Sequence, residues 1–233
     1  MAEESYTSIT NITKDLERMR ELTNGWIESL DISGGEPTLH PELLKVFEIM
    51  RNLFPVSRIN LRTNGVSLLS QGDEFWNSVK KHRIDILATK YPTVDWAAVD
   101  ATAAEHGTKI IYGSMGDELN KTSWRLTRDF SGSGNILNNF INCPTSIYNM
   151  DLKEGKIYCG DIHGTMTVAK HFGIDVELCE DDRLDIYKIS SVQEIYDFVA
   201  RPYPHCRYCA IDKRKSTGKY MLSNRELGEW VEE

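Results

Sequence analysis

Residues 30–41 read LDISGGEPTLHP, and the predicted fold is organised around this stretch. An apolar run that begins at Trp26 ends in two glycines, a carboxylate and a proline, which predicts a buried parallel strand leading into a loop. Gly34 and Gly35 allow the backbone to turn sharply and to approach a ligand closely. Glu36 then lies at the carboxyl end of a strand, where α/β barrels place their chemistry. A plain strand-to-helix turn explains the two glycines equally well.

Helices and strands are predicted to alternate around this stretch. The apolar spacing predicts helices over residues 10–23, 41–53, 71–82 and 93–106, and strands over residues 26–33, 56–62, 84–89 and 109–112. We expect Thr10 or Asn11 to cap the first helix, and Asn24 with Gly25 to end it. Because the connecting loops are short, the alternation predicts a parallel sheet with right-handed crossovers, as in a full or partial barrel.

The bulk composition excludes several classes of protein. The chain has 233 residues, and a hydrophobic content of 40% supports a sizeable core. No apolar run reaches the ~18 residues of a membrane span, and the acidic start MAEE is unlike a signal peptide. The net charge of −8 argues against a general nucleic-acid binder. We therefore expect a cytoplasmic protein that binds neither membrane nor nucleic acid.

No cysteine precedes Cys143, and the composition changes near that residue. We therefore place a domain boundary near residue 140, which gives domains over residues 1–140 and 141–233. Two short strands are predicted between Cys143 and Cys159, over residues 146–151 and 156–158, with a turn at residues 154–155, and such a hairpin brings the two cysteines together. Five cysteines in a chain without a secretion signal indicate metal or catalytic use rather than disulfides.

Cys206 and Cys209 are separated by two residues, a gap that lets both sulfurs face one metal. Together with Cys143 and Cys159 they supply four thiolates in two pairs, enough for a [4Fe–4S] cluster or a structural zinc. Separately buried cysteines, acting as small apolar residues, are the alternative. Cys179 lies in an acidic run that raises its pKa, so we leave it out of the site.

The SGGEP segment resembles that of radical S-adenosylmethionine (SAM) enzymes, where it follows the second barrel strand. The resemblance implies a partial parallel (β/α) barrel of the radical SAM type whose first strand is missing. It also implies that the Gly34–Gly35 backbone and Glu36 meet the amino group of SAM. Thr63 and Asn64 match the TNG segment of that family, although a turn explains them almost as well. Thr89 ends the next strand, where relatives often use a hydroxyl on the ribose or carboxylate of SAM, and a plain strand end is the alternative.

The cysteine pattern resembles the abbreviated SPASM domain, also called twitch, which follows the barrel in many radical SAM enzymes. The resemblance implies a small C-terminal α+β domain in which Cys143, Cys159, Cys206 and Cys209 hold an auxiliary [4Fe–4S] cluster. The family's catalytic motif, C-x-x-x-C-x-x-C, is absent from the sequence given. The sequence is therefore a trimmed piece, starts late, or is a natural remnant. We expect one of the first two, because Glu36 and the strand ends look intact.

Three functions follow from these patterns. The first is a radical SAM enzyme, in which a 5′-deoxyadenosyl radical abstracts a substrate hydrogen and a reductant protein supplies electrons. Without the catalytic cluster ligands, we expect the chain as given to be inactive. The second is a non-catalytic iron–sulfur or zinc-binding remnant on the same scaffold, and the third is a zinc-stabilised fragment without its own activity. The resemblance implies a peptide, a sugar or a nucleotide-derived substrate and does not select among them.

Overall fold

The computed structural model describes residues 6–113, 124–125, 128–147, 149–216 and 223–231. They form two compact units, which divide the chain between Lys121 and Thr122. The predicted boundary near residue 140 lies inside the second unit. The reason is visible in the backbone: the amides of Arg128 and Asp129 donate to the carbonyls of Trp230 and Tyr208 over 2.7 and 2.9 Å.

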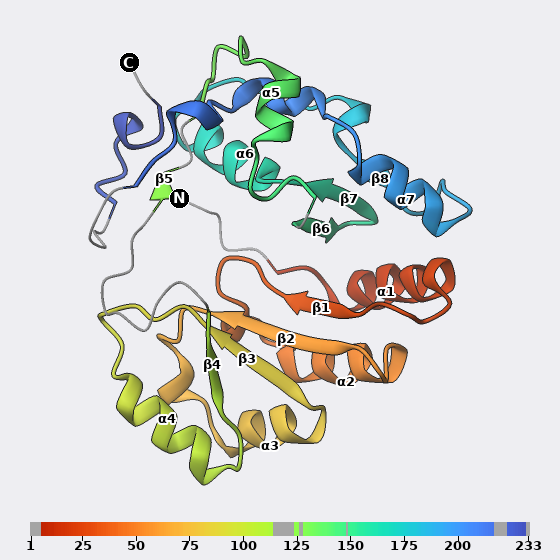
Figure 1. The fold of residues 1–233 in the computed structure, drawn as a ribbon. Coiled ribbons are helices and arrows are strands. Elements are labelled where there is room, and N and C mark those ends of the chain that lie inside the picture. Colours follow the sequence, from red (N-terminus) through yellow and green to blue (C-terminus); the bar gives the residue numbers. More distant parts are fainter. Residues whose placement is uncertain (1–5, 114–123, 126–127, 148, 217–222, 232–233) are drawn as a thin grey trace. The chain divides into compact units, whose positions relative to one another are not determined.

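The first unit is α/β with a four-stranded parallel sheet in the order β1-β2-β3-β4, as the alternation predicts (Figure 1). Each strand is joined to the next by a helix. The elements are α1 (Ile9–Thr23), β1 (Ser29–Ile32), η1 (Pro37–Leu39), α2 (Leu43–Leu53), β2 (Arg58–Thr63), η2 (Leu68–Ser70), α3 (Asp73–Lys81), β3 (Ile84–Ala88), α4 (Trp96–Glu105) and β4 (Ile110–Tyr112).

Two details of this unit differ from the sequence-based expectation. Ser8 caps α1 in place of Thr10 or Asn11, because its hydroxyl accepts the Asn11 amide at 3.3 Å. The predicted stop is confirmed, since Asn24 adopts the left-handed conformation with φ of 52°. Strand β1 is shorter than predicted and only half-buried, because it lies at the edge of the described sheet.

The core of the first unit lies between the sheet and its helices. Phe47, Phe54 and Trp76 are fully buried there against the strand residues Ile59 and Leu61. Because side chains alternate along a strand, every second residue faces the other side of the sheet. Most of those positions are polar, namely Ser29, Asp31, Arg58, Asn60, Arg62 and Asp85, and Leu87 and Ile111 are the apolar exceptions. One face of the sheet is therefore apolar and covered, and the other carries charged and amide groups.

The second unit combines short helices with small antiparallel sheets, consistent with the predicted α+β class. Strands β6, β7 and β8 form one sheet, and β5 pairs with β9. The elements are β5 (Trp124–Arg125), α5 (Ile136–Ile141), β6 (Met150–Lys153), β7 (Lys156–Cys159), α6 (Ile162–His171), η3 (Glu180–Asp182), β8 (Leu184–Asp185), α7 (Val192–Val199), η4 (Pro204–Tyr208), η5 (Ile211–Lys213), β9 (Lys215–Ser216) and η6 (Leu227–Glu229).

The predicted hairpin is confirmed, with its turn at Glu154 and Gly155. Both turn residues have positive φ, 51° and 72°, as a tight hairpin turn requires. The first strand begins later than expected, at Met150, so it pairs Met150 with Cys159. Cys143 is therefore not part of the hairpin and lies on the chain that enters it.

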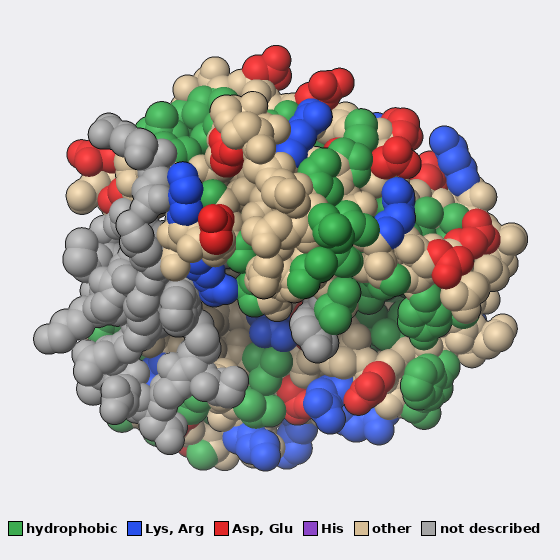
Figure 2. Space-filling model, turned by 45° about the horizontal axis from the view of Figure 1, so that its top comes forward, with side chains coloured by type: hydrophobic (Ala, Val, Ile, Leu, Met, Phe, Trp, Pro, Cys, Tyr) green, Lys and Arg blue, Asp and Glu red, His purple; other side chains and the backbone are tan. Residues whose placement is uncertain are grey.

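Several large apolar side chains of the second unit are exposed, among them Leu137, Ile141 and Ile147. Figure 2 shows apolar side chains lying next to one another on the surface, with acidic and basic side chains around them. In the part of the chain that the structure describes, no helix is long and apolar enough to cross a membrane.

Candidate functional sites

The loop after β1 leaves its backbone open. Gly34 has a φ of 152°, a conformation that side chains rarely adopt, so glycine is required there. A Cβ atom built on Gly34 or Gly35 would meet no heavy atom within 4 Å. A ligand can therefore reach the peptide groups of these two residues without moving a side chain.

Glu36 joins the ends of two strands through its carboxylate. Its Oε1 atom accepts the Thr38 amide at 3.1 Å, the Thr38 hydroxyl at 2.6 Å and the Thr63 hydroxyl at 2.8 Å. Its Oε2 atom accepts the Asn64 amide at 2.9 Å. Because an ionised carboxylate offers about four acceptor positions on its two oxygens, Oε2 retains room for a further donor. Three of the predicted residues, Glu36, Thr63 and Asn64, thus meet at the carboxyl edge of the sheet.

Thr38 is a residue of this site that sequence reasoning missed. It is buried, and its hydroxyl lies between Glu36 and the hydroxyl of Ser67. The sequence does offer one signal for it, because Thr38 lies two residues after a loop carboxylate, and side chains in Asx- and ST-type turns bond at this spacing. Thr38 therefore helps to orient the Glu36 carboxylate.

The TNG segment forms a turn with a fixed shape. The Asn64 side chain accepts the Val66 amide at 2.9 Å, so it is used inside the turn. Gly65 has a φ of 79°, and a Cβ there would lie 2.2 Å from the ring of Trp96. Thr89 is exposed next to this turn, and its amide donates to the Thr63 carbonyl at 3.0 Å. The six predicted contact residues thus lie along three adjacent strand ends.

A polar network covers the open face of the sheet below these loops. The Asn60 amide donates to Asp31 at 2.7 Å and to the hydroxyl of Ser29 at 2.9 Å. Arg62 forms an ion pair with the other oxygen of Asp31. Asn60 is buried in this network, whereas Ser29, Asp31 and Arg62 are exposed, so these three groups can meet a polar ligand.

The cysteines lie in the second unit, on three different segments. Cys143 follows α5, Cys159 ends β7, and Cys206 and Cys209 lie in and directly after η4. The Cys209 amide donates to the Cys206 carbonyl at 3.2 Å, which sets the turn of the C-x-x-C segment. The buried Asn139 also holds this turn, because its amide donates to the carbonyls of Cys206 and Cys209 at 2.9 and 2.5 Å.

The four predicted metal-ligating thiols influence one another's ionisation. Burial, with smaller contributions from Cys143, Asp182 and Cys159, raises the pKa of Cys206 to about 11. Burial also raises the pKa of Cys209 to about 11, with contributions from Cys206 and Cys143. Burial and the charge on Asp151 raise the pKa of Cys159 to about 11. All four side chains therefore belong to one local group.

The sulfurs of this group do not form a ready-made coordination sphere. Within the described ranges, no three Cys, His, Asp or Glu side chains are arranged to hold a metal ion. Cys179 is not one of these four residues. Its thiol contacts Asp182 at 3.4 Å, and burial followed by that hydrogen bond raises its pKa.

His205 directly precedes the C-x-x-C segment. The structure buries it, and neither ring nitrogen has a hydrogen-bond partner among the described residues. Burial lowers its pKa to about 4, so the ring is neutral. An unpartnered buried imidazole beside Cys206 is costly unless another group meets it.

A scan against models of protein families finds no match for this chain, and a search among curated proteins finds no relative. The assignment of function therefore depends on the geometry of the two sites. Each site lies within one unit.

Proposed function

We propose that this chain is the scaffold of a radical SAM-type enzyme, with a SAM-binding edge in the first unit and a cluster-binding group in the second. One observation gives the main support for this proposal. Glu36, Thr63 and Asn64, which are distant in sequence, are joined by hydrogen bonds at the carboxyl edge of a parallel sheet. Ligands of α/β sheets bind at this edge.

The residues at this edge fit the amino-acid end of SAM. The open peptide groups of Gly34 and Gly35 suit a carboxylate or amino group, and Oε2 of Glu36 keeps capacity to accept from an ammonium. The exposed Thr89 supplies a hydroxyl next to them. When bound with a reduced cluster, SAM would supply a radical that removes hydrogen from a substrate. The protein's part is to bind and orient it.

The cysteine group fits a metal centre held by four thiolates. Cys206 is coupled to Cys143 and Cys159, and Cys209 to Cys206 and Cys143. The unpartnered nitrogens of His205 lie beside the same segment, where a bound cluster would give the ring a partner. Four thiolates suit iron–sulfur and zinc alike. The ligand set is accordingly a firmer proposal than the metal.

A second candidate is a metal-binding protein on this scaffold without SAM chemistry. The observation that favours it is the use of Glu36 inside its own loop, where four hydrogen bonds engage the carboxylate. In this reading Glu36 holds two strand ends together and meets no ligand.

SAM titration by calorimetry separates the two candidates. Replacing Glu36 by Gln should weaken SAM binding by about 1.5–3 kcal/mol, the value of a hydrogen bond to a charged group. Glu48→Gln, an exposed change on α2, is the matched control and should bind as the unchanged chain does. Circular dichroism of each variant verifies folding. Absence of SAM binding to the unchanged chain would support the second candidate.

Metal analysis tests the cysteine group. After anaerobic reconstitution with iron and sulfide, we expect loss of iron in each of four variants, Cys143→Ala, Cys159→Ala, Cys206→Ala and Cys209→Ala. Cys179→Ala should retain full iron, because its thiol contacts Asp182 and belongs to no metal group. Full iron content in Cys143→Ala would refute a shared centre.

A further inference from the structure

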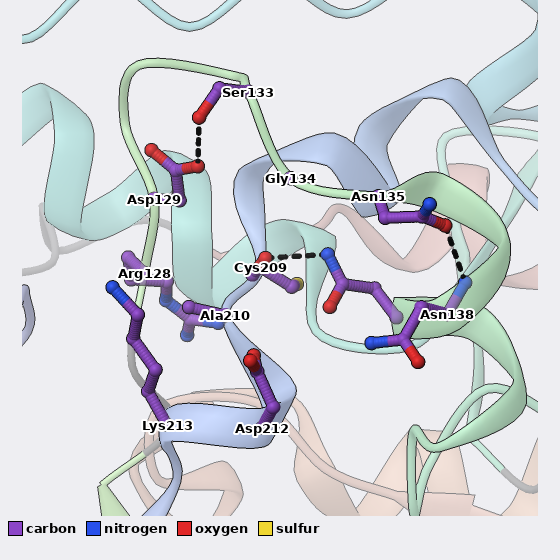
Figure 3. A pocket seen from close by; sticks show the side chains of 11 residues that line it. Arg128, Asp129, Ser133, Gly134, Asn135, Asn138, Cys209, Ala210, Asp212 and Lys213 are labelled. Atoms are coloured by element: carbon purple, nitrogen blue, oxygen red, sulfur yellow. Dashed lines mark hydrogen bonds between the residues drawn. The ribbon is translucent and has the colours of Figure 1, made fainter.

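The second unit contains a polar pocket that shares one residue, Cys209, with the cysteine group and otherwise lies outside the proposed function. Its volume is about 290 Å³, at the lower end of the range for small-molecule sites. Two segments line it, residues 128–139 and residues 209–213. Figure 3 shows that Cys209 and Ala210 form its back wall.

Two cations lie on one side of the pocket. Arg128 is 4% exposed, and its Nη2 atom forms an ion pair with Asp161. Its Nε atom is buried and has no hydrogen-bond partner in the described part of the chain. Lys213 rises beside Arg128 (Figure 3). A buried guanidinium nitrogen without a partner is costly, and an oxygen ligand in the pocket would remove that cost.

Acidic and amide groups complete the lining. The Asp212 side chain points into the pocket between the two sides, and Asn135 and Asn138 lie opposite the cations (Figure 3). Asp129 also lines the pocket, and its carboxylate accepts the hydroxyls of Ser131 and Ser133. The lining itself is balanced, with two cations and two carboxylates, and Arg128 is paired in addition with Asp161, which lies outside the lining.

This balance selects the charge of the ligand. A simple anion would be attracted by Arg128 and Lys213 but repelled by Asp212. A simple cation would be attracted by Asp212 but repelled by Arg128 and Lys213. A ligand that carries both signs satisfies both sides. The uncharged amides of Asn135 and Asn138 offer donors and acceptors to the remainder of such a molecule.

We infer that this pocket binds a small zwitterion of amino-acid size, with its carboxylate at Arg128 and Lys213 and its ammonium at Asp212. The binding itself does not depend on a metal. One extension rests on the proposed function: if Cys209 holds the cluster, the bound zwitterion lies against it and marks a substrate position of amino-acid or peptide-terminus chemistry.

Nuclear magnetic resonance titration of the full chain tests the inference, with the backbone amides of Gly134 and Ala210 as reporters. The probes are glycine, acetate, methylammonium and inorganic phosphate. We expect saturable shifts with glycine, and a dissociation constant at least tenfold lower than for acetate or methylammonium. Phosphate binding as tight as glycine binding, or the absence of saturable shifts with glycine, would overturn the inference.

Two single variants divide the site into its halves. Lys213→Met should weaken glycine and acetate at least fivefold and leave methylammonium unchanged. Asp212→Asn should weaken glycine and methylammonium at least fivefold and leave acetate unchanged. Lys188→Met, an exposed change outside the pocket, is the control. Equal losses for all three probes in either variant would contradict the assigned orientation.

The same titration on iron-loaded and metal-free protein separates this inference from the proposed function. If the chain binds glycine but takes up no iron, the proposed cluster is refuted and the inferred zwitterion site is supported. If the four cysteines bind iron but the chain does not bind glycine, the zwitterion site is refuted and the cluster is supported.

Discussion

Different kinds of contact stabilise the interior of each of the two units. The first unit buries large apolar side chains such as Phe47, Phe54 and Trp76 between a regular sheet and its helices. The second unit has short elements and buries apolar side chains such as Ile186 and Phe198, and buried polar groups in addition link its segments. Arg128, Asn139 and Asp182 are each at most 4% exposed, and each is tied to another segment by its side chain.

This difference has a consequence for stability. Apolar burial is non-directional and tolerates small shifts, whereas a buried ion pair or amide depends on both partners being in place. The first unit should therefore fold on its core alone. The second should be sensitive to single polar changes and to the state of its cysteines, because metal ligation in a small unit contributes directly to folding.

The largest effect is expected from Phe47→Ala, which opens a cavity in the first unit. Truncating a fully buried Phe costs about 3–5 kcal/mol. Hydrogen exchange should show faster opening of the β2 amides and unchanged opening of the β7 amides. Val56→Ala, at a position 77% exposed, is the control and should change neither. If exchange accelerated equally at β2 and β7, the two units would unfold together, and the difference drawn between them would be wrong.

Asp161→Asn is the corresponding change in the second unit. It leaves the buried Arg128 guanidinium without its carboxylate, and breaking such a pair costs about 3 kcal/mol. Hydrogen exchange should now accelerate at β7 and not at β2. The control is Asp175→Asn, an exposed carboxylate in the same unit. An unchanged β7 would mean that the ion pair does not stabilise this unit.

Asn139→Ala should have a smaller effect confined to the C-x-x-C turn. The variant loses two hydrogen bonds, and the Cys209 carbonyl loses its Asn139 partner while the Cys206 carbonyl keeps the Cys209 amide, so we expect a cost of about 1–3 kcal/mol. Chemical denaturation measures the loss. Asn142→Ala, an exposed amide change near the same helix, should cost no more than about 0.5 kcal/mol. Similar losses in the two variants would contradict the role given to Asn139.

The smallest effect is expected from the titration of His106 in the first unit. Hydrogen bonds with the Thr102 carbonyl and with Asp73 raise its pKa. The folded form thus holds the proton more strongly than the unfolded chain does. Its stabilising contribution is complete below the ordinary histidine pKa and is lost as the pH rises through the raised value. Asp73→Asn should lower the pKa of His106 in an NMR titration, and Glu74→Gln should lower it less.

The regular part of the fold followed from the sequence. The four helices and four parallel strands of the first unit occur where periodicity predicts them, with ends shifted by a few residues. The exceptions have local causes. Strand β1 begins at Ser29 instead of Trp26, because Trp26 lies beyond the edge pairing with β2 and is exposed. The hairpin after Cys143 could be found from its Glu-Gly turn alone.

The candidate sites were predictable in their residue types and less so in their contacts. Sequence placed Glu36 and the TNG segment at neighbouring strand ends, which follows from parallel pairing. It did not predict that Thr38 and Thr63 would both bond one oxygen of Glu36. Nor did it predict the burial of His205, because the residues next to this histidine in the sequence do not indicate which distant segments cover it.

The sequence by itself determined the alternation of elements, the strand ends that carry polar residues and the spacing of the cysteines. These are set by local periodicity and by turn chemistry, which act over a few residues. Only the tertiary structure decided which distant groups meet. The joining of residues 128–139 to residues 209–213 made the pocket at Arg128, and the return of η4 to Asn139 fixed the C-x-x-C turn. Contacts between distant segments depend on the packing of the whole unit, and local sequence does not encode them.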